Sequence, residues 1–325
     1  MHKRILFLSK GENASSTRYR ALQYFPLYLE SGYKPVHTTI SGGLLPFLVA
    51  LFQASQADIV VLLRKTFPAP ALWLLRVVSK KLFFELDDAI FSNTDGSYSK
   101  TRMSRFINTV RQCDHVFAGN QYLAEITKAY QANTSIVPTA LNTQKYSLPT
   151  KSDSKDFVLV WIGSRSTKKY IAGILPAIEK AAEAVPNLKL KIIADFELES
   201  DVLPINNTPW AETTEAAEVR SADVGLAPLP ADNWTKGKCA LKVLQYLSAG
   251  LPVISSPTSA NGYVVDHLKS GFLVENESEW SQSIITAYEQ REQLPIMGEY
   301  GRKRVCSEFD INVVFKNILK KLESI

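Results

Sequence analysis

Short apolar runs alternate with segments of helical periodicity along nearly the whole chain, and this order constrains the fold more than any other feature of the sequence. In the first part of the chain, buried strands are expected at 5–8, 35–39, 59–63, 82–86, 115–118 and 135–137. Helices are expected between them at 20–29, 44–53, 71–79 and 102–111, and after the capping residue Asn120. Strands separated by helices pair in parallel and are covered on both faces. The pattern therefore predicts an α/β domain with a doubly wound parallel sheet.

The same alternation restarts after a linker expected at 143–155. Strands are expected at 157–162, 188–194, 224–227 and 253–255, helices at 169–185, 214–221 and 240–249, and a loop at 206–210. We therefore expect two Rossmann-like domains, 1–145 and 146–310, with a helix at 311–325 that crosses back to the first domain. Because ligands bind beyond the carboxyl ends of parallel strands, the two sheets are expected to face one cleft.

The composition fits a cytoplasmic protein with two cores. The chain has 325 residues, 46% of them hydrophobic, and no apolar run approaches the 18 or so residues needed to span a bilayer. The apolar run at 5–8 is too short for a signal peptide. The three cysteines lack the spacing of a disulfide framework or a metal site, so no metal is expected.

Charge is divided unevenly between the two halves. Residues 1–150 carry 17 Lys and Arg against 9 Asp and Glu, a net charge of +8, whereas 151–325 carry 20 against 23, a net charge of −3. A basic half implies an anionic partner, and since no nucleic-acid motif accompanies the charge, nucleic acid is not expected. Basic residues beside 44–52 and 73–78 favour an anionic membrane surface or a lipid-diphosphate acceptor. A helix with a core face and a solvated basic edge fits the same pattern equally well.

The segment 223–256 carries the most specific chemical motif. It predicts two short strands around one helix, with leucines on the core face and Lys242 and Gln245 on another face. Gly237 and Lys238 stand just before this helix. Free backbone N–H groups, the positive end of the helix and two lysines are therefore expected to converge on an anion, most simply a diphosphate.

This segment resembles the nucleotide-sugar-binding segment of retaining GT-B glycosyltransferases of family four. The resemblance rests on GKC at 237–239, on LQY at 244–246 as in one sub-group, on AGLPV at 249–253, and on flanking DVGLAPLP and GFLVENESEW. It implies a GT-B fold, no bound metal or cofactor, and a hydrogen bond from the ribose to Gln245. The family usually has Glu where this chain has Gln245, and a second Glu where it has Gly237.

Two loops of the first half hold further candidate residues. In the turn-rich loop after the first strand, Gly11 and Ser16 offer close backbone approach and a small donor, and Arg18 and Arg20 offer charge for a phosphate. Ordinary surface arginines remain the alternative there. No GxGxxG motif is present, which disfavours a nicotinamide cofactor.

Asp87 and Asp88 follow a strand at its carboxyl end, where a ligand is expected. By resemblance, one of them holds the acceptor hydroxyl or assists its deprotonation. A metal site and a simple turn cap are the alternatives that the residues leave open.

The second half opens with a strand that leads into a Gly-Ser turn. Gly163, Ser164 and Arg165 resemble the loop that contacts the donor diphosphate in the same sub-group. Cleavage of the donor leaves a diphosphate, so Arg165, Lys238 and Lys242 are expected to stabilise the charge that develops on the leaving group.

Together these features predict a hexosyltransferase that moves a sugar from a nucleoside-diphosphate sugar to a saccharide or lipid-linked acceptor, in cell-surface polysaccharide or glycolipid synthesis. The family resemblance implies that it retains the anomeric configuration and needs no metal. A nucleotide-sugar epimerase of the same fold is one competitor. A non-catalytic partner subunit that binds a sugar nucleotide is the other, and the glycine at position 237 keeps it open. The four dispersed histidines lack a nucleophile signature, so triad hydrolysis is unsupported.

Overall fold

The structure divides into two compact units. The computed structural model describes residues 3–147 and 155–324, so part of the linker expected at 143–155 lies outside the described residues. Unit 1 comprises Met1–Ala140, Asp232–Cys239 and Ile311–Ile325, and unit 2 comprises Leu141–Ala231 and Ala240–Asp310. The sequence pattern places the segment Asp232–Cys239 in the second domain, and the structure corrects this because its packing partners belong to unit 1.

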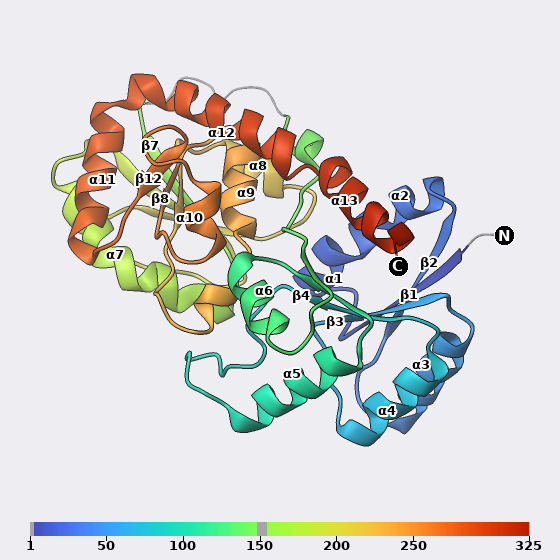
Figure 1. The fold of residues 1–325 in the computed structure, drawn as a ribbon. Helices are drawn as coiled ribbons and strands as arrows, with labels where there is room; N and C mark the ends of the chain where they lie inside the picture. Colours follow the sequence, from blue (N-terminus) through green and yellow to red (C-terminus); the bar gives the residue numbers. More distant parts are fainter. Residues whose placement is uncertain (1–2, 148–154, 325) are drawn as a thin grey trace. The chain divides into compact units, whose positions relative to one another are not determined.

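Unit 1 is built on a six-stranded parallel sheet with the order β2-β1-β3-β4-β5-β6 (Figure 1). Its strands are β1 Lys3–Ser9, β2 Tyr33–Thr39, β3 Ile59–Leu63, β4 Leu82–Leu86, β5 His115–Ala118 and β6 Thr134–Ile136. Its helices are α1 Ser15–Arg20, η1 Leu22–Tyr24, α2 Phe25–Glu30, α3 Leu44–Ser55, α4 Ala69–Val78, α5 Lys100–Gln112, α6 Gln121–Lys128, η4 Thr235–Gly237 and α13 Ile311–Ser324. This is the doubly wound sheet that the alternation predicts.

Two hydrophobic cores flank this sheet because alternate residues of each strand point to opposite faces. Leu6 and Leu8 of β1 pack with α3, α4, α5 and α6 on one face. Ile5 and Phe7 pack on the other face with α2 and with the terminal helix α13. The β3 and β4 strands lie at the centre and are buried along their whole length, as expected for a sheet covered on both sides.

Unit 2 holds a second six-stranded parallel sheet with the order β12-β11-β10-β7-β8-β9. Its strands are β7 Phe157–Ile162, β8 Leu188–Ala194, β9 Ile205–Pro209, β10 Val224–Ala227, β11 Val253–Ser255 and β12 Gly271–Leu273. Its helices are η2 Thr143–Tyr146, η3 Arg165–Thr167, α7 Lys168–Ala182, α8 Glu215–Arg220, α9 Leu241–Ser248, α10 Ala260–Val264, α11 Glu277–Glu289, η5 Arg291–Gln293 and α12 Leu294–Glu308. Trp161 of β7 and Trp280 of α11 are buried in its main core.

Two predictions of secondary structure are wrong. The single helix expected at 20–29 is broken into α1, η1 and α2, since Pro26 lacks the N–H that a continuous helix would need and instead sits in the first turn of α2. The loop expected at 206–210 is largely the strand β9, which pairs with β8 from Ile205 to Pro209. A strand at the edge of a sheet can carry polar residues, so it lacks the apolar run that marks a central strand.

No helix within the described ranges is both long and apolar enough to cross a membrane.

Gly298 allows helices α9 and α12 of unit 2 to pack closely. A Cβ atom at this position would lie 1.8 Å from the carbonyl oxygen of Gly250, the residue with φ +75° that follows the end of α9. We expect Gly298→Ala to lower the free energy of unfolding by about 1–3 kcal/mol, because the backbone must shift. Urea unfolding followed by circular dichroism measures this change.

Gly173 provides the matched control, since it also lies in a helix of unit 2 but a Cβ atom added there would have no other atom within 4 Å. Gly173→Ala should raise the free energy of unfolding by about 0.5–1 kcal/mol. Equal effects of the two substitutions would contradict the close packing at Gly298.

Candidate functional site

Asp87 and Asp88 lie directly beyond the carboxyl end of β4, where Arg64 from the end of the neighbouring strand β3 reaches both. Arg64 Nε is 3.0 Å from Asp87 Oδ1, and its Nη2 is 2.5 Å from Asp88 Oδ2. The backbone of Arg64 has φ +51°, a left-handed conformation that is uncommon for a side-chain-bearing residue. Strained backbone of this kind is often found at functional sites. Here the Arg64 side chain lies against the two carboxylates.

Lys238 completes an ion-pair cluster made of Arg64, Asp87, Asp88 and Lys238. Its Nζ is 3.0 Å from Asp88 Oδ1. Asn120, the cap of α6, fixes the backbone around it, because Nδ2 donates to the carbonyl oxygens of Lys236 at 3.1 Å and Lys238 at 2.9 Å. The segment Asp232–Cys239 is therefore held in unit 1 by both charge and backbone hydrogen bonds.

Gly237 is required by close packing in this segment. A Cβ at Gly237 would lie 2.3 Å from the backbone N of Ala89 and 2.7 Å from its Cβ. A glutamate, which the resembling family usually has at this position, would have no space here. The departure from the family pattern thus has a steric reason within unit 1.

The electrostatics of the ion-pair cluster favour paired charges over a metal. Burial raises the pKa of Asp88, and Arg64 and Lys238 oppose that rise. Burial by itself lowers the pKa of Arg64, but Asp87 and Asp88 raise it above its ordinary value. The arginine and the lysine already supply the positive charge that a metal ion would bring to these two carboxylates.

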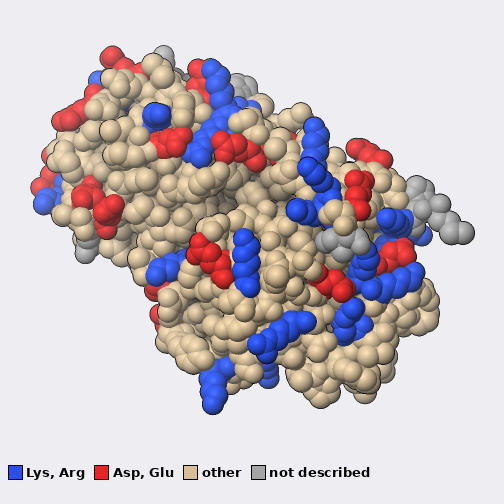
Figure 2. All heavy atoms as spheres, viewed as in Figure 1, with Lys and Arg blue, Asp and Glu red and all other residues tan. Residues whose placement is uncertain are grey.

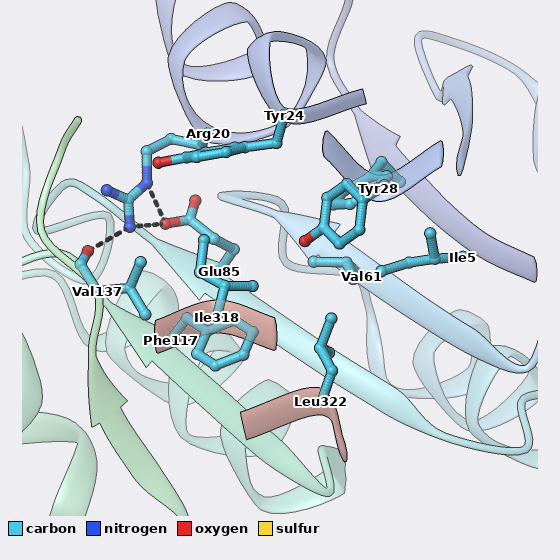
Figure 3. A pocket seen from close by; sticks show the side chains of 11 residues that line it. Ile5, Arg20, Tyr24, Tyr28, Val61, Glu85, Phe117, Val137, Ile318 and Leu322 are labelled. Carbon is cyan, nitrogen blue, oxygen red and sulfur yellow. Dashed lines mark hydrogen bonds and ion pairs between the residues drawn. The ribbon is translucent and has the colours of Figure 1, made fainter. Parts of the chain in front are cut away.

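Arg20 is a buried structural cation, which corrects its expected role as a phosphate ligand. Its Nε lies 2.5 Å from Glu85 Oε1, and its Nη2 donates to the carbonyl oxygen of Val137 at 2.7 Å (Figure 3). Burial lowers the pKa of Arg20 by itself, but Glu85 raises it above its ordinary value, so the guanidinium stays charged. The pair borders a cavity of about 20 Å³ whose other walls come from aromatic and aliphatic side chains of the sheet, α2 and α13. This space suits a single water molecule and not a substrate.

The other residues of the first loop lie around the end of β1. Ser9 Oγ accepts hydrogen bonds from the backbone N of Gly11 and from Thr17 Oγ1, both at 3.0 Å. Ser16 and Arg18 are on α1, and the Arg18 guanidinium lies 5.5 Å from the centre of the Tyr19 ring. Their expected contact with a phosphate or an acceptor stays a prediction.

In unit 2, Lys242 lies against the Gly163 turn, as expected of two segments that serve one donor site. A Cβ at Gly163 would be 2.6 Å from Lys242 Nζ and 2.1 Å from the Trp161 ring. Lys242 Nζ lies 3.8 Å from the centre of that ring and 3.4 Å from Thr167 Oγ1. The absence of a side chain at Gly163 therefore leaves the space that this ammonium group uses.

Ser164 and Arg165 form the start of the short helix η3. Ser164 caps this helix together with Thr167 in a reciprocal capping box. The backbone N of Arg165 donates to Asp195 Oδ1 at 2.6 Å, and its Nη2 donates to the carbonyl oxygen of Asp195 at 3.2 Å. The exposed Arg165 thus stands on the turn at the carboxyl end of β7, and the half-buried Lys242 of α9 lies against this turn.

Gln245, which is expected on a face of α9 other than the leucine face, is buried. Its Nε2 donates to Glu215 Oε1 at 2.7 Å. Tyr146 Oη and Trp210 Nε1 also donate to the carboxylate of Glu215, each at 2.6 Å. Glu215 is the functional-region residue that sequence reasoning missed, because its partners are distant in sequence. The substitution of Gln for the usual Glu was the available signal, since a buried Gln amide needs an acceptor.

The comparisons with known proteins bear on the family and the fold. Residues 156–290 match the family model of glycosyl transferases group 1. The fold is similar to that of HepE from Anabaena, solved in complex with UDP, at 14% identity over 99% of this chain and 100% of that chain, with a TM-score of 0.73. It is also similar to sucrose-phosphate synthase from Thermosynechococcus elongatus, at 11% identity over 99% and 100% of the two chains, with a TM-score of 0.77. No curated protein sequence matches the chain significantly.

The buried pair of Arg20 and Glu85 yields a stability prediction. Removing one member leaves an uncompensated buried charge, so Arg20→Met and Glu85→Leu should each lower the free energy of unfolding by about 3–5 kcal/mol. The double substitution should lose much less than the sum, because both charges leave the core together. Urea unfolding of the three variants tests this. If Arg20→Met instead leaves the stability unchanged and impairs donor binding, Arg20 is a ligand residue as expected from the sequence.

Proposed function

We propose that this chain, whose residues 156–290 match the family model of glycosyl transferases group 1, transfers a hexose from a nucleoside-diphosphate sugar to a hydroxyl group of a saccharide or lipid-linked acceptor. The proposal includes retention of the anomeric configuration and no requirement for a bound metal. It also includes a cytoplasmic location, peripheral on the inner face of the membrane, and a role in polysaccharide or glycolipid synthesis.

The observation that carries the proposal is the pairing of Lys242 with the Gly163 turn at the carboxyl end of β7. Cleavage of a nucleoside-diphosphate sugar leaves a diphosphate, and cations fixed beside it stabilise the charge that grows in the transition state. The exposed Arg165 supplies one such cation on this turn, and Lys242 supplies a second from the adjacent helix α9. The similar HepE has been solved with UDP-glucose, which makes a uridine donor the first to test.

The residues of unit 1 are assigned to the acceptor. Asp87 and Asp88 lie beyond β4 with their charges balanced by Arg64 and Lys238. In this assignment one carboxylate accepts a hydrogen bond from the attacking hydroxyl and holds it in position. Gln245 serves the donor, with its amide nitrogen held by Glu215 so that its carbonyl oxygen is the acceptor for a ribose hydroxyl.

The two competing functions predict different products. Incubation with UDP- and GDP-sugars should give slow donor hydrolysis, which marks a transferase. Interconversion of the sugars would identify an epimerase. Binding without either reaction would identify a non-catalytic partner subunit and overturn the proposal.

Lys242→Ala and Arg165→Ala should each reduce transfer by a factor of about 100 or more, by analogy with the loss of one charge-stabilising donor. The loss should appear mainly in kcat, because the stabilised charge develops in the transition state. Initial rates with a UDP-sugar, at saturating donor, measure this effect.

Lys180→Ala is the control, since Lys180 is exposed near the end of α7 and the substitution removes the same charge. Turnover of this variant should equal that of the unaltered protein. Near-normal turnover of both Lys242→Ala and Arg165→Ala, with folding intact, would show that the diphosphate site lies elsewhere.

Asn substitutions at Asp87 and Asp88 should separate the acceptor from the donor. Each keeps the size of the side chain and removes its charge, so we expect transfer to fall in at least one variant while UDP affinity, measured by calorimetry, is retained. Loss of UDP binding in both variants would contradict the assignment of these carboxylates to the acceptor. A strict dependence of activity on added divalent metal would favour the metal-site alternative.

A further inference from the structure

Helix α3 exposes most of its large apolar side chains, and among them only Phe47 and Leu51 pack, partly buried, against the core. Its fully buried residues are Ala50 and Ala54, whereas Leu45 and Phe52 are exposed to 73% and 65%. A surface helix of a globular protein has the opposite arrangement, with large apolar residues on the core face and polar residues outside. The solvated basic edge considered from the sequence is therefore absent from the described residues of this helix, none of which is charged.

The neighbouring helix α4 extends the same surface. Its exposed large apolar residues are Trp73, Leu74 and Val77, and α4 contacts α3 along the outside of unit 1 (Figure 1). The apolar surface consists of the exposed large side chains of both helices: Leu44, Leu45, Leu48, Val49, Phe52, Trp73, Leu74 and Val77. A contiguous patch of this size on a soluble protein marks an interaction site.

The charged residues within helices α3, α4 and α5 are all basic. Acidic residues stand only beyond the helix ends, where Asp114 pairs with Arg76 and Asp58 with Lys80. Helix α5 lies beside α4 on the same face of the sheet, and its sequence KTRMSRFINTVRQ holds four basic residues. None of the 35 residues of α3, α4 and α5 is Asp or Glu. On the face seen in Figure 2, the surface over α3 and α4 is mostly uncharged, with Lys and Arg side chains along its edge. An apolar centre beside a helix that carries only basic charges is complementary to an anionic bilayer.

We propose that the α3–α4 face inserts its apolar side chains into the interface of an anionic membrane, with the basic residues of α5 against the lipid headgroups. A second copy of the chain fits less well, because two basic borders would face each other across a symmetric contact. The proposal deepens the proposed function, on which it rests for the acceptor: a membrane-bound enzyme has direct access to an acceptor carried on a lipid.

Vesicle sedimentation tests the apolar part without requiring any transferase activity. The unaltered protein should sediment with vesicles of phosphatidylcholine and phosphatidylglycerol, and Leu45→Glu should weaken this binding about tenfold or more, because one apolar anchor is lost and a repelled charge is added. Leu29→Glu is the matched control. Leu29 is also exposed, but it lies on α2, on the opposite face of the same sheet, so its substitution should leave binding unchanged.

Charge reversal tests the basic border in the same assay. Arg102→Glu with Arg105→Glu should weaken binding, and high salt should weaken binding of the unaltered protein. Lys316→Glu with Lys320→Glu changes the net charge equally on α13, at the opposite face, and should have little effect.

Three results would overturn the proposal. They are no sedimentation with anionic vesicles, sedimentation that ignores both lipid charge and salt, and equal effects of each test variant and its control. A concentration-dependent dimer that Leu45→Glu abolishes, without vesicle binding, would assign the face to a second copy. Vesicle binding that follows these predictions, without any donor turnover, would support the membrane-binding surface and contradict the proposed transferase activity.

Discussion

The contact of Arg64 with two consecutive carboxylates organises the functional edge of unit 1. One guanidinium pairs with both Asp87 and Asp88, and Lys238 then adds its charge to Asp88. Leaving the buried carboxylate of Asp88 unpaired would cost several kcal/mol. The positions of the loop after β4, the end of β3 and the segment Asp232–Cys239 therefore depend on the same set of charges. The residues assigned to the acceptor are held by this mutual neutralisation.

Unit 2 positions its candidate residues by a different physical means. Lys242 lies over the face of Trp161, and a glycine opposite leaves the space for its ammonium group. Cation–π attraction orients this lysine without adding a negative charge, because the ring carries no net charge. In unit 1, by contrast, the cations of the cluster lie against carboxylates. The two units therefore offer different electrostatic environments to a substrate.

Local patterns predicted the central strands, and the doubly wound order is confirmed by both sheets. Local patterns failed where a long-range partner decides the outcome. Arg20 looked like a ligand residue because nothing near it in sequence shows Glu85, which lies 65 positions away. The hydrogen bond from Gln245 to Glu215 was not predicted because Glu215 stands on another helix. The strand β9 was missed since an edge strand needs few apolar residues. The spacing of apolar residues along the chain predicts helices and strands well, but it does not predict ion pairs between residues that are distant in sequence.

The membership of Asp232–Cys239 in unit 1 also bears on how the molecule can be divided. The chain passes from one unit to the other four times, after Ala140, Ala231, Cys239 and Asp310. Neither unit is a continuous stretch of sequence, so cutting the gene once near residue 145 would separate Lys238 from Asp88 and Asn120. It would also strip α13 from the face of the first sheet that it covers. Autonomous folding of either half is therefore disfavoured, and the two units are expected to fold as parts of one chain.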